Sequence, residues 1–129
     1  MNLSLLLFVG VGGFFGAISR FLLSNFVNKS LNSYEFVIPF GTLAVNVLGS
    51  FIIGFMAVYF EENVNPEYKA LVITGFLGAL TTFSTFSLEN IIMIQDKEYF
   101  HAGLNIVLNV VLTLMATIMA INLFKKVYG

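Results

Sequence analysis

Four long apolar stretches, separated by short polar breaks, decide what this chain can fold into. A helix that crosses a membrane needs about 20 mostly apolar residues, and each stretch is at least that long. We therefore predict an all-α membrane protein with four transmembrane helices, at about 3–26, 36–60, 68–94 and 99–124. The connections are so short that successive helices run antiparallel. What remains is too small for a soluble domain, so residues 1–129 are predicted to be a single transmembrane domain.

Composition excludes most other classes of protein. Hydrophobic residues make up 58% of the chain and charged residues only 10%, whereas a soluble domain carries about 25% charged residues. Cysteine is absent, which excludes a disulfide framework and a thiolate metal site. The net charge of −1 gives no support to nucleic-acid binding. We also predict no enzymatic activity, because the hydroxyl residues of the spans have no base at comparable depth.

The positive charges give no preferred orientation in the membrane. Lys and Arg usually concentrate in cytoplasmic loops, but here they divide equally between the two predicted sides. One side has Lys69, Lys125 and Lys126, and the other has Arg20, Lys29 and Lys97. Two interpretations remain open at this point. A small protein can simply have a weak signal, or the chain inserts both ways and pairs head-to-tail, as the inverted repeats of transporters do.

The third apolar stretch has an unusual centre. Gly75 and Gly78 are followed by five hydroxyl residues, and Phe83 and Phe86 stand among them; the hydroxyls are Thr81, Thr82, Ser84, Thr85 and Ser87. Glycine and threonine are mediocre helix formers, so one interpretation is an interrupted helix whose free carbonyls bind a buried monovalent cation. Such irregular backbone must face protein or a watery cavity. The other interpretation is a continuous helix whose hydroxyls bond back to the preceding turn.

Two asparagines, Asn46 and Asn109, are predicted to lie near the same depth as Phe83. They indicate either a shared polar path or interhelical hydrogen bonds that only hold the helices together. No Asp or Glu falls near mid-depth, and we predict that His101 is interfacial. Arg20 and Glu89 are charges set inside span ends on one face. They are expected to pair, to build an electropositive vestibule, or to extend to the headgroups.

Three segments together resemble the Fluc (CrcB) family of bacterial fluoride channels. These are GFFGAISR at 13–20, GTLAVNVLGSF at 41–51 and GFLGALTTFSTF at 75–86, of which the third is the most specific. The likeness covers the whole chain in length and number of spans. The fourth span matches loosely, because Asn109 and Thr113 stand where the family pattern leads us to expect a serine and a small residue.

The resemblance implies a dual-topology homodimer of antiparallel subunits in the bacterial inner membrane, which exports fluoride passively. It implies that the carbonyls of Gly78 and Thr81 bind a structural sodium ion shared by both subunits. It also implies roles for the pore phenylalanines, the pore amide and a vestibule cation, which are Phe83, Phe86, Asn46 and Arg20. Fluoride needs hydrogen-bond donors in place of its water shell, and the residues predicted to complete this pathway are Thr82, Ser84, Thr85 and Asn109.

The alternative is a coupled carrier of dual topology, either for a small ion or for multiple drugs. Multidrug exporters with four short spans have an essential glutamate in the first span, and this span has none. A third possibility is a scaffold protein without transport activity. In a scaffold, changes at Asn46 or Phe83 would alter only stability.

Overall fold

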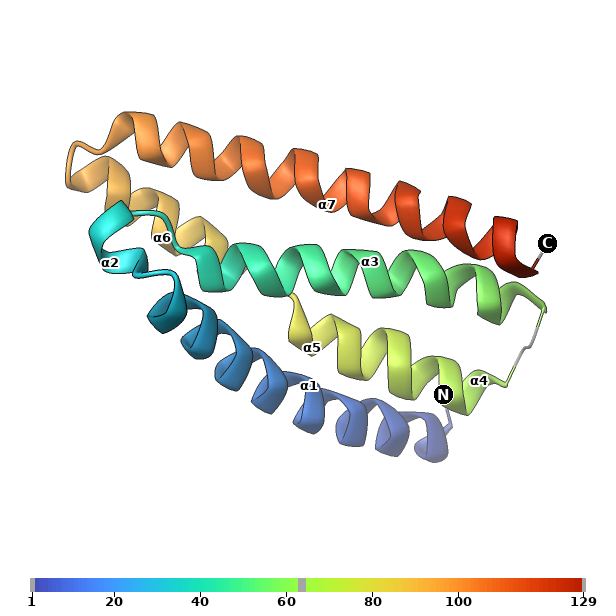
Figure 1. The fold of residues 1–129 in the computed structure, drawn as a ribbon. Helices are drawn as coiled ribbons and strands as arrows, with labels where there is room; N and C mark the ends of the chain where they lie inside the picture. Colours follow the sequence, from blue (N-terminus) through green and yellow to red (C-terminus); the bar gives the residue numbers. More distant parts are fainter. Residues whose placement is uncertain (1, 63–64, 129) are drawn as a thin grey trace.

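The computed structural model describes residues 2–62 and 65–128, and in these ranges the chain is helical with short connections (Figure 1). Three spans are α1 (Leu3–Ser30), α3 (Phe40–Glu62) and α7 (Tyr99–Tyr128), and a short helix α2 (Ser33–Phe36) precedes α3. The third span comprises α4 (Pro66–Lys69), the π-helix η1 (Ala70–Leu77), α5 (Gly78–Leu80) and α6 (Ser84–Gln95). All four spans are long and apolar enough to cross a bilayer, and the chain is a multi-pass membrane protein.

Side-chain caps explain where several of these helices begin. The side chain of Asn65 accepts hydrogen bonds from the N–H groups of Glu67 and Tyr68, and Pro66 occupies the first turn of α4, where a missing N–H has no consequence. Asn28 is polar, yet α1 continues through it to Ser30. Its Oδ1 accepts from the N–H of Gly41 at 2.7 Å, so it satisfies the first turn of α3.

The start of α3 changes the predicted position of Asn46 along its helix. Because α3 begins at Phe40 and not at 36, Asn46 lies six residues into the helix, which corresponds to about 9 Å along its axis. Asn109 lies ten residues into α7, at about 15 Å. The two asparagines therefore stand at different distances from the starts of their helices. Their side chains nevertheless lie within 3.0 Å of each other, so the two residues share one depth, as the sequence predicted.

The spans pack through glycines of α1 and around a small apolar core. α1 approaches η1 so closely that a Cβ added at Gly12 or Gly16 would overlap the backbone of η1. In Figure 1, α3 lies between α1 and α7, and α6 lies on the far side of α3 from the viewer. The buried apolar core is small and includes Val45, Leu77 and Leu80. Large apolar side chains instead cover the outside of the chain, as expected where lipid replaces water.

Candidate functional site

Regular helix ends in the middle of the third span. α5 ends at Leu80, Thr81 has an extended backbone conformation (φ −85°, ψ 156°), and α6 begins at Ser84. We call residues 81–83 the connecting segment. In an α-helix the N–H of Thr82 would donate to the carbonyl of Gly78. Here that N–H donates to the side chain of Asn46 on α3, over 2.8 Å.

Asn46 holds the connecting segment with both ends of its amide. Its Oδ1 accepts from the N–H of Thr82, and its Nδ2 donates to the carbonyl of Thr82 at 3.2 Å. The same nitrogen donates to Oδ1 of Asn109 on α7 at 3.0 Å. A side-chain amide has two N–H donors, and both are used here. Asn46, predicted to donate to an anion, is therefore fully hydrogen-bonded within the chain.

The neighbouring threonines complete the local structure. Gly49 of α3 lets the connecting segment approach, because a Cβ at this position would overlap the methyl group of Thr81. The hydroxyl of Thr81 donates to the carbonyl of Leu77 at 3.1 Å. The hydroxyl of Thr82 accepts from the N–H of Thr85 at 3.2 Å and so caps the first turn of α6.

The carbonyl oxygens of Gly78 and Thr81 are available as ligands. Within residues 2–62 and 65–128, no N–H or hydroxyl group donates to either oxygen. Gly78 itself is exposed at the surface of the single chain. Unwound carbonyls of this kind can coordinate sodium in membrane proteins, and these are the two residues predicted to do so.

A cavity of about 220 Å³ lies beside the connecting segment and is lined from α3, α6 and α7. Its lining residues are Asn46, Ser50, Thr81, Thr82, Phe83, Phe86, Asn109, Val110 and Thr113. Most of the residues predicted for an anion pathway therefore meet in one place. Two of them, Ser84 and Thr85, do not line this cavity, although their hydroxyls lie 3.5 and 3.1 Å from that of Thr82.

The two phenylalanines differ sharply in exposure. Phe83 is 80% exposed, whereas Phe86 is buried at 9%. Their ring centroids lie 5.4 Å apart, and the planes are inclined by 52°. An aromatic ring has a positive edge, which can face an anion. The ring of Phe86 is therefore enclosed by the chain, while the ring of Phe83 lies on the outer surface of the single chain.

A second cavity, also of about 220 Å³, lies against the connecting segment and is lined partly from α1. Arg20, Ser24, Thr42, Thr82 and Thr85 supply its polar lining, and Thr82 therefore lines both cavities. Arg20 is half-buried there. The predicted vestibule cation thus stands near hydroxyl groups at one side of the connecting segment.

The carboxylate of Glu89 is hydrogen-bonded to Thr42, whereas the sequence suggested Arg20 as its partner. The hydroxyl of Thr42 donates to its Oε1 at 2.5 Å, and its buried Oε2 has no hydrogen-bond partner among the residues that the structure describes. In the described part of the chain, Arg20 and Glu89 form no ion pair. Of the three expectations for these charges, direct pairing is therefore not what the structure has. His101, at the start of α7, contacts Glu98 at 2.8 Å.

Sequence reasoning missed two polar residues near this site, Asn90 and Asn105. Both are buried, at 5% and 0% exposure, and Nδ2 of Asn105 donates to Oδ1 of Asn90 at 2.9 Å. A signal for Asn105 was present, because residues four apart lie on one face of a helix, and Asn105 precedes Asn109 by four. Asn90 has no such signal, since its partner depends on how α6 faces α7.

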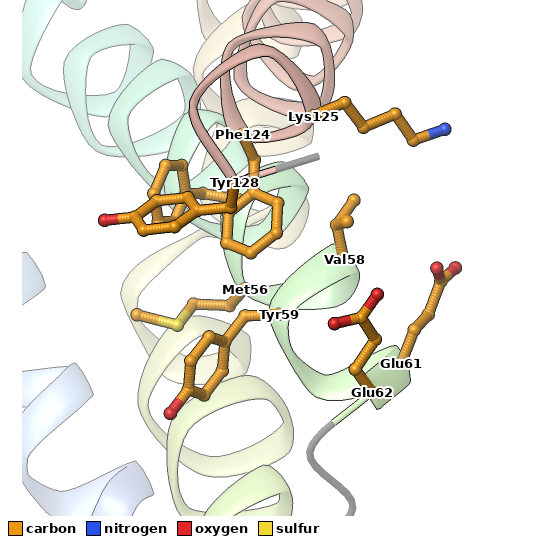
Figure 2. A pocket seen from close by; sticks show the side chains of 9 residues that line it. Met56, Val58, Tyr59, Glu61, Glu62, Phe124, Lys125 and Tyr128 are labelled. Carbon is orange, nitrogen blue, oxygen red and sulfur yellow. The ribbon is translucent and has the colours of Figure 1, made fainter.

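A larger cavity of about 520 Å³ lies where α3 and α7 end, and it has a different character (Figure 2). Rings of Phe55, Phe124 and Tyr128 pack there with centroids 4.8 to 6.2 Å apart. Figure 2 shows Glu61 and Glu62 to one side of the rings. Aromatic rings beside charged residues at helix ends are typical of a membrane interface. This cavity has no lining residue from the connecting segment.

Comparison with known proteins gives a consistent result. Residues 7–121 match the family model described as CrcB-like protein, Camphor Resistance (CrcB). A protein of a Nitratiruptor species, named Fluoride-specific ion channel FluC, is 62% identical over 129 residues, covering 100% of this chain and 98% of the relative. Relatives with the same name from a Sulfurovum species and from Campylobacter jejuni are 58% identical over 125 residues and 52% identical over 107 residues. The alignment with the Sulfurovum protein covers 97% of this chain and 97% of the relative. The alignment with the Campylobacter jejuni protein covers 82% of this chain and 85% of the relative.

Proposed function

Because the chain belongs to the CrcB-like family, we propose that it is a fluoride-selective channel that lowers cytoplasmic fluoride by passive export. The observation that carries this proposal is the full-length identity of 62% to a protein named as a fluoride-specific ion channel. The bacterial relatives also support a location in the bacterial inner membrane. Like those relatives, the chain is proposed to act without catalysis.

The cavity beside the connecting segment offers a suitable path for this anion. Fluoride is small and strongly hydrated, so its water shell must be replaced by donors. The hydroxyl of Thr82 and the ring edges of Phe83 and Phe86 line the cavity and are placed to supply them. The hydroxyls of Ser84 and Thr85 stand outside the cavity, 3.5 and 3.1 Å from that of Thr82, and would extend this set of donors. Conduction also requires that each site bind weakly, and no charged residue of the described chain lines this cavity. Asn46 and Asn109 would orient this lining, and either amide can donate to fluoride only by exchanging one of its present bonds.

We infer that the third span is interrupted in the membrane and that two copies pair across this face with opposite orientations. The extended backbone of Thr81 supports an interruption. Exposure supports pairing, because Phe83, Ser84 and Thr85 are all exposed in a single copy. Irregular backbone at membrane depth must be covered by protein or border a cavity. A second copy would provide that cover, and the even division of Lys and Arg fits insertion in both directions.

The same arrangement suggests a structural sodium ion between the copies. The free carbonyls of Gly78 and Thr81 are two ligands per copy, which makes four in a symmetric pair. When bound, such an ion would hold the two interrupted spans together and place positive charge near the anion path. The chain's own contribution is to keep these oxygens free, because Asn46 takes the N–H that Gly78 would otherwise accept.

Fluoride efflux from liposomes tests the proposed function. Purified protein is reconstituted, potassium fluoride is loaded inside, and external fluoride is followed with an electrode. A channel releases fluoride only when a potassium ionophore carries the balancing charge, and it releases chloride far more slowly. A coupled carrier would release fluoride without the ionophore when a proton gradient is present. A scaffold would release none under either condition.

A further inference from the structure

We propose that four buried asparagines form one hydrogen-bonded relay that positions Phe86 and the connecting segment around the cavity. Two of them, Asn105 and Asn90, act as positioning residues without lining the cavity. The relay runs from Asn46 through Asn109 and Asn105 to Asn90. This inference deepens the proposed function and rests on it, because it assigns a role in conduction to residues outside the path.

Each amide in the relay donates to the next one. Nδ2 of Asn46 donates to Asn109 at 3.0 Å, and Nδ2 of Asn109 donates to Oδ1 of Asn105 at 3.1 Å. Nδ2 of Asn105 then donates to Oδ1 of Asn90 at 2.9 Å. All four residues are at most 9% exposed. In so apolar a setting these bonds are strong, and an unpaired amide would be costly.

The relay begins and ends on the backbone at the two sides of the first turn of α6. It begins at the N–H of Thr82, which donates to Asn46, and it ends at the carbonyl of Phe86, which accepts from Nδ2 of Asn90 at 2.9 Å. These two backbone groups belong to residues four apart in sequence. The relay therefore ties both flanks of Phe83 and the hydroxyl cluster to α3 and α7.

Only one assignment of donors and acceptors along the relay is possible. The N–H of Thr82 can only donate, and the carbonyl of Phe86 can only accept. If one intermediate amide turned over, it would place two donors or two acceptors face to face. The relay therefore specifies a single arrangement of the backbone on either side of Phe83. A bond that merely holds two helices together needs one pair of side chains.

Replacement of Asn105 by leucine tests the proposal. Asn105→Leu removes the side-chain acceptor for Asn109 and the donor for Asn90. We expect about tenfold slower fluoride efflux per folded dimer and a lower fluoride-to-chloride permeability ratio. Thr117→Val is the matched control, because it removes a 3.0 Å hydrogen bond from α7 to the carbonyl of Ser50 on α3, outside the relay. The control should keep both values within twofold of wild type.

A double variant separates a relay from independent packing effects. In a relay, Asn90→Leu and Asn105→Leu break the same bond, so the double variant should be no slower than the more affected single variant. Two independent contributions would instead multiply to about 100-fold. That multiplication, or wild-type efflux and selectivity in folded Asn105→Leu dimers, would overturn the proposal.

A milder variant covers the case in which Asn105→Leu fails to fold. Asn90→Ala removes the last two links, the bond from Asn105 and the bond to the carbonyl of Phe86, and leaves the bond from Asn109 to Asn105 in place. Amide hydrogen exchange over residues 82–87 should be faster in Asn90→Ala than in Thr117→Val, and equal exchange would reject the relay. This readout does not depend on conduction. If the wild-type protein conducts no fluoride, the proposed function fails, while the exchange result still decides whether the relay exists.

Discussion

The two halves of the third span are attached to the bundle in opposite ways. The first half, η1, packs on α1 through glycines, and a Cβ at Gly75 would lie 2.6 Å from the carbonyl of Val9. The second half, α6, is attached to α7 through amides, with Asn90 bonded to Asn105. The first kind of contact tolerates no added volume. The second tolerates no lost hydrogen bond.

This difference explains how one span can contain a polar connecting segment. Backbone-to-backbone packing on α1 fixes η1 without any polar side chain. Beyond Thr81 the helical bonds stop, and asparagines from α3 and α7 satisfy the backbone groups that the interruption releases. The first half is therefore a rigid support, and the second half carries the proposed anion path. Substitutions in the first half should destroy the fold, while those in the second should alter conduction first.

The largest effect is expected from Gly16→Val. Its side chain would overlap the backbone of Phe76, which cannot move unless α1 and η1 separate. Overpacking of a core usually destabilises by about 1–3 kcal/mol, and more when backbone must shift. We expect no folded protein in size-exclusion chromatography. Gly10→Val is the control, since nothing lies within 4 Å of a Cβ there. Equal folded yields for the two variants would contradict the comparison.

Asn46→Leu should have the next largest effect. It leaves the N–H and the carbonyl of Thr82 without their partner, and each unsatisfied buried group costs about 1–3 kcal/mol. Fluoride efflux should fall by about 100-fold, which corresponds to about 2.7 kcal/mol. The exposed Asn25→Leu on α1 provides a control of identical chemistry. Wild-type efflux in Asn46→Leu liposomes would show that the bonds between Asn46 and Thr82 do not shape the path.

Phe83→Ile should affect conduction and spare the stability of the single chain. At 80% exposure the ring contributes little to packing within one copy, so the free energy of unfolding should change by no more than about 0.5 kcal/mol. Efflux should fall about tenfold because the positive ring edge is lost. Phe100→Ile, at 75% exposure, is the comparison for a general surface effect. A change in efflux shared by both variants would remove the special role of Phe83.

Arg20→Gln should have the smallest effect. Arg20 lines the second cavity beside Thr42 and Thr85 and would concentrate anions near the path. We expect efflux to fall about two- to threefold at low ionic strength and to match wild type at about 1 M salt, where screening is strong. Lys29→Gln, an exposed change on the same helix, controls for net charge. An effect of Arg20→Gln that is independent of salt would exclude electrostatic attraction.

Much of the architecture follows from the sequence because hydropathy alone sets the length of a span. The four apolar stretches correspond to helical spans, although α1 extends past Phe26 to Ser30 and α7 extends to Tyr128. Polar residues such as Asn28 stay helical because they bond to a neighbouring helix. The glycine and hydroxyl content of the third stretch left two interpretations open, since composition does not determine whether neighbouring helices satisfy a released backbone.

The partners of polar side chains were harder to predict. Arg20 and Glu89 lie on one face by sequence, yet Glu89 bonds to Thr42. Asn46 was expected to face an anion, but both of its N–H groups bond within the chain. Each outcome depends on the rotation of one helix against another by a fraction of a turn. Hydrophobic periodicity does not define that rotation where every face of a helix is apolar.

The proposed passive conduction of fluoride by this chain is tested most directly by the reversal potential of its current. Purified protein is placed in a planar bilayer with a tenfold fluoride gradient and equal chloride on both sides. A fluoride-selective channel should give a current that reverses at about 59 mV in magnitude, the value for a tenfold gradient of a monovalent ion. A reversal near zero, or no current from the folded protein, would contradict passive fluoride conduction.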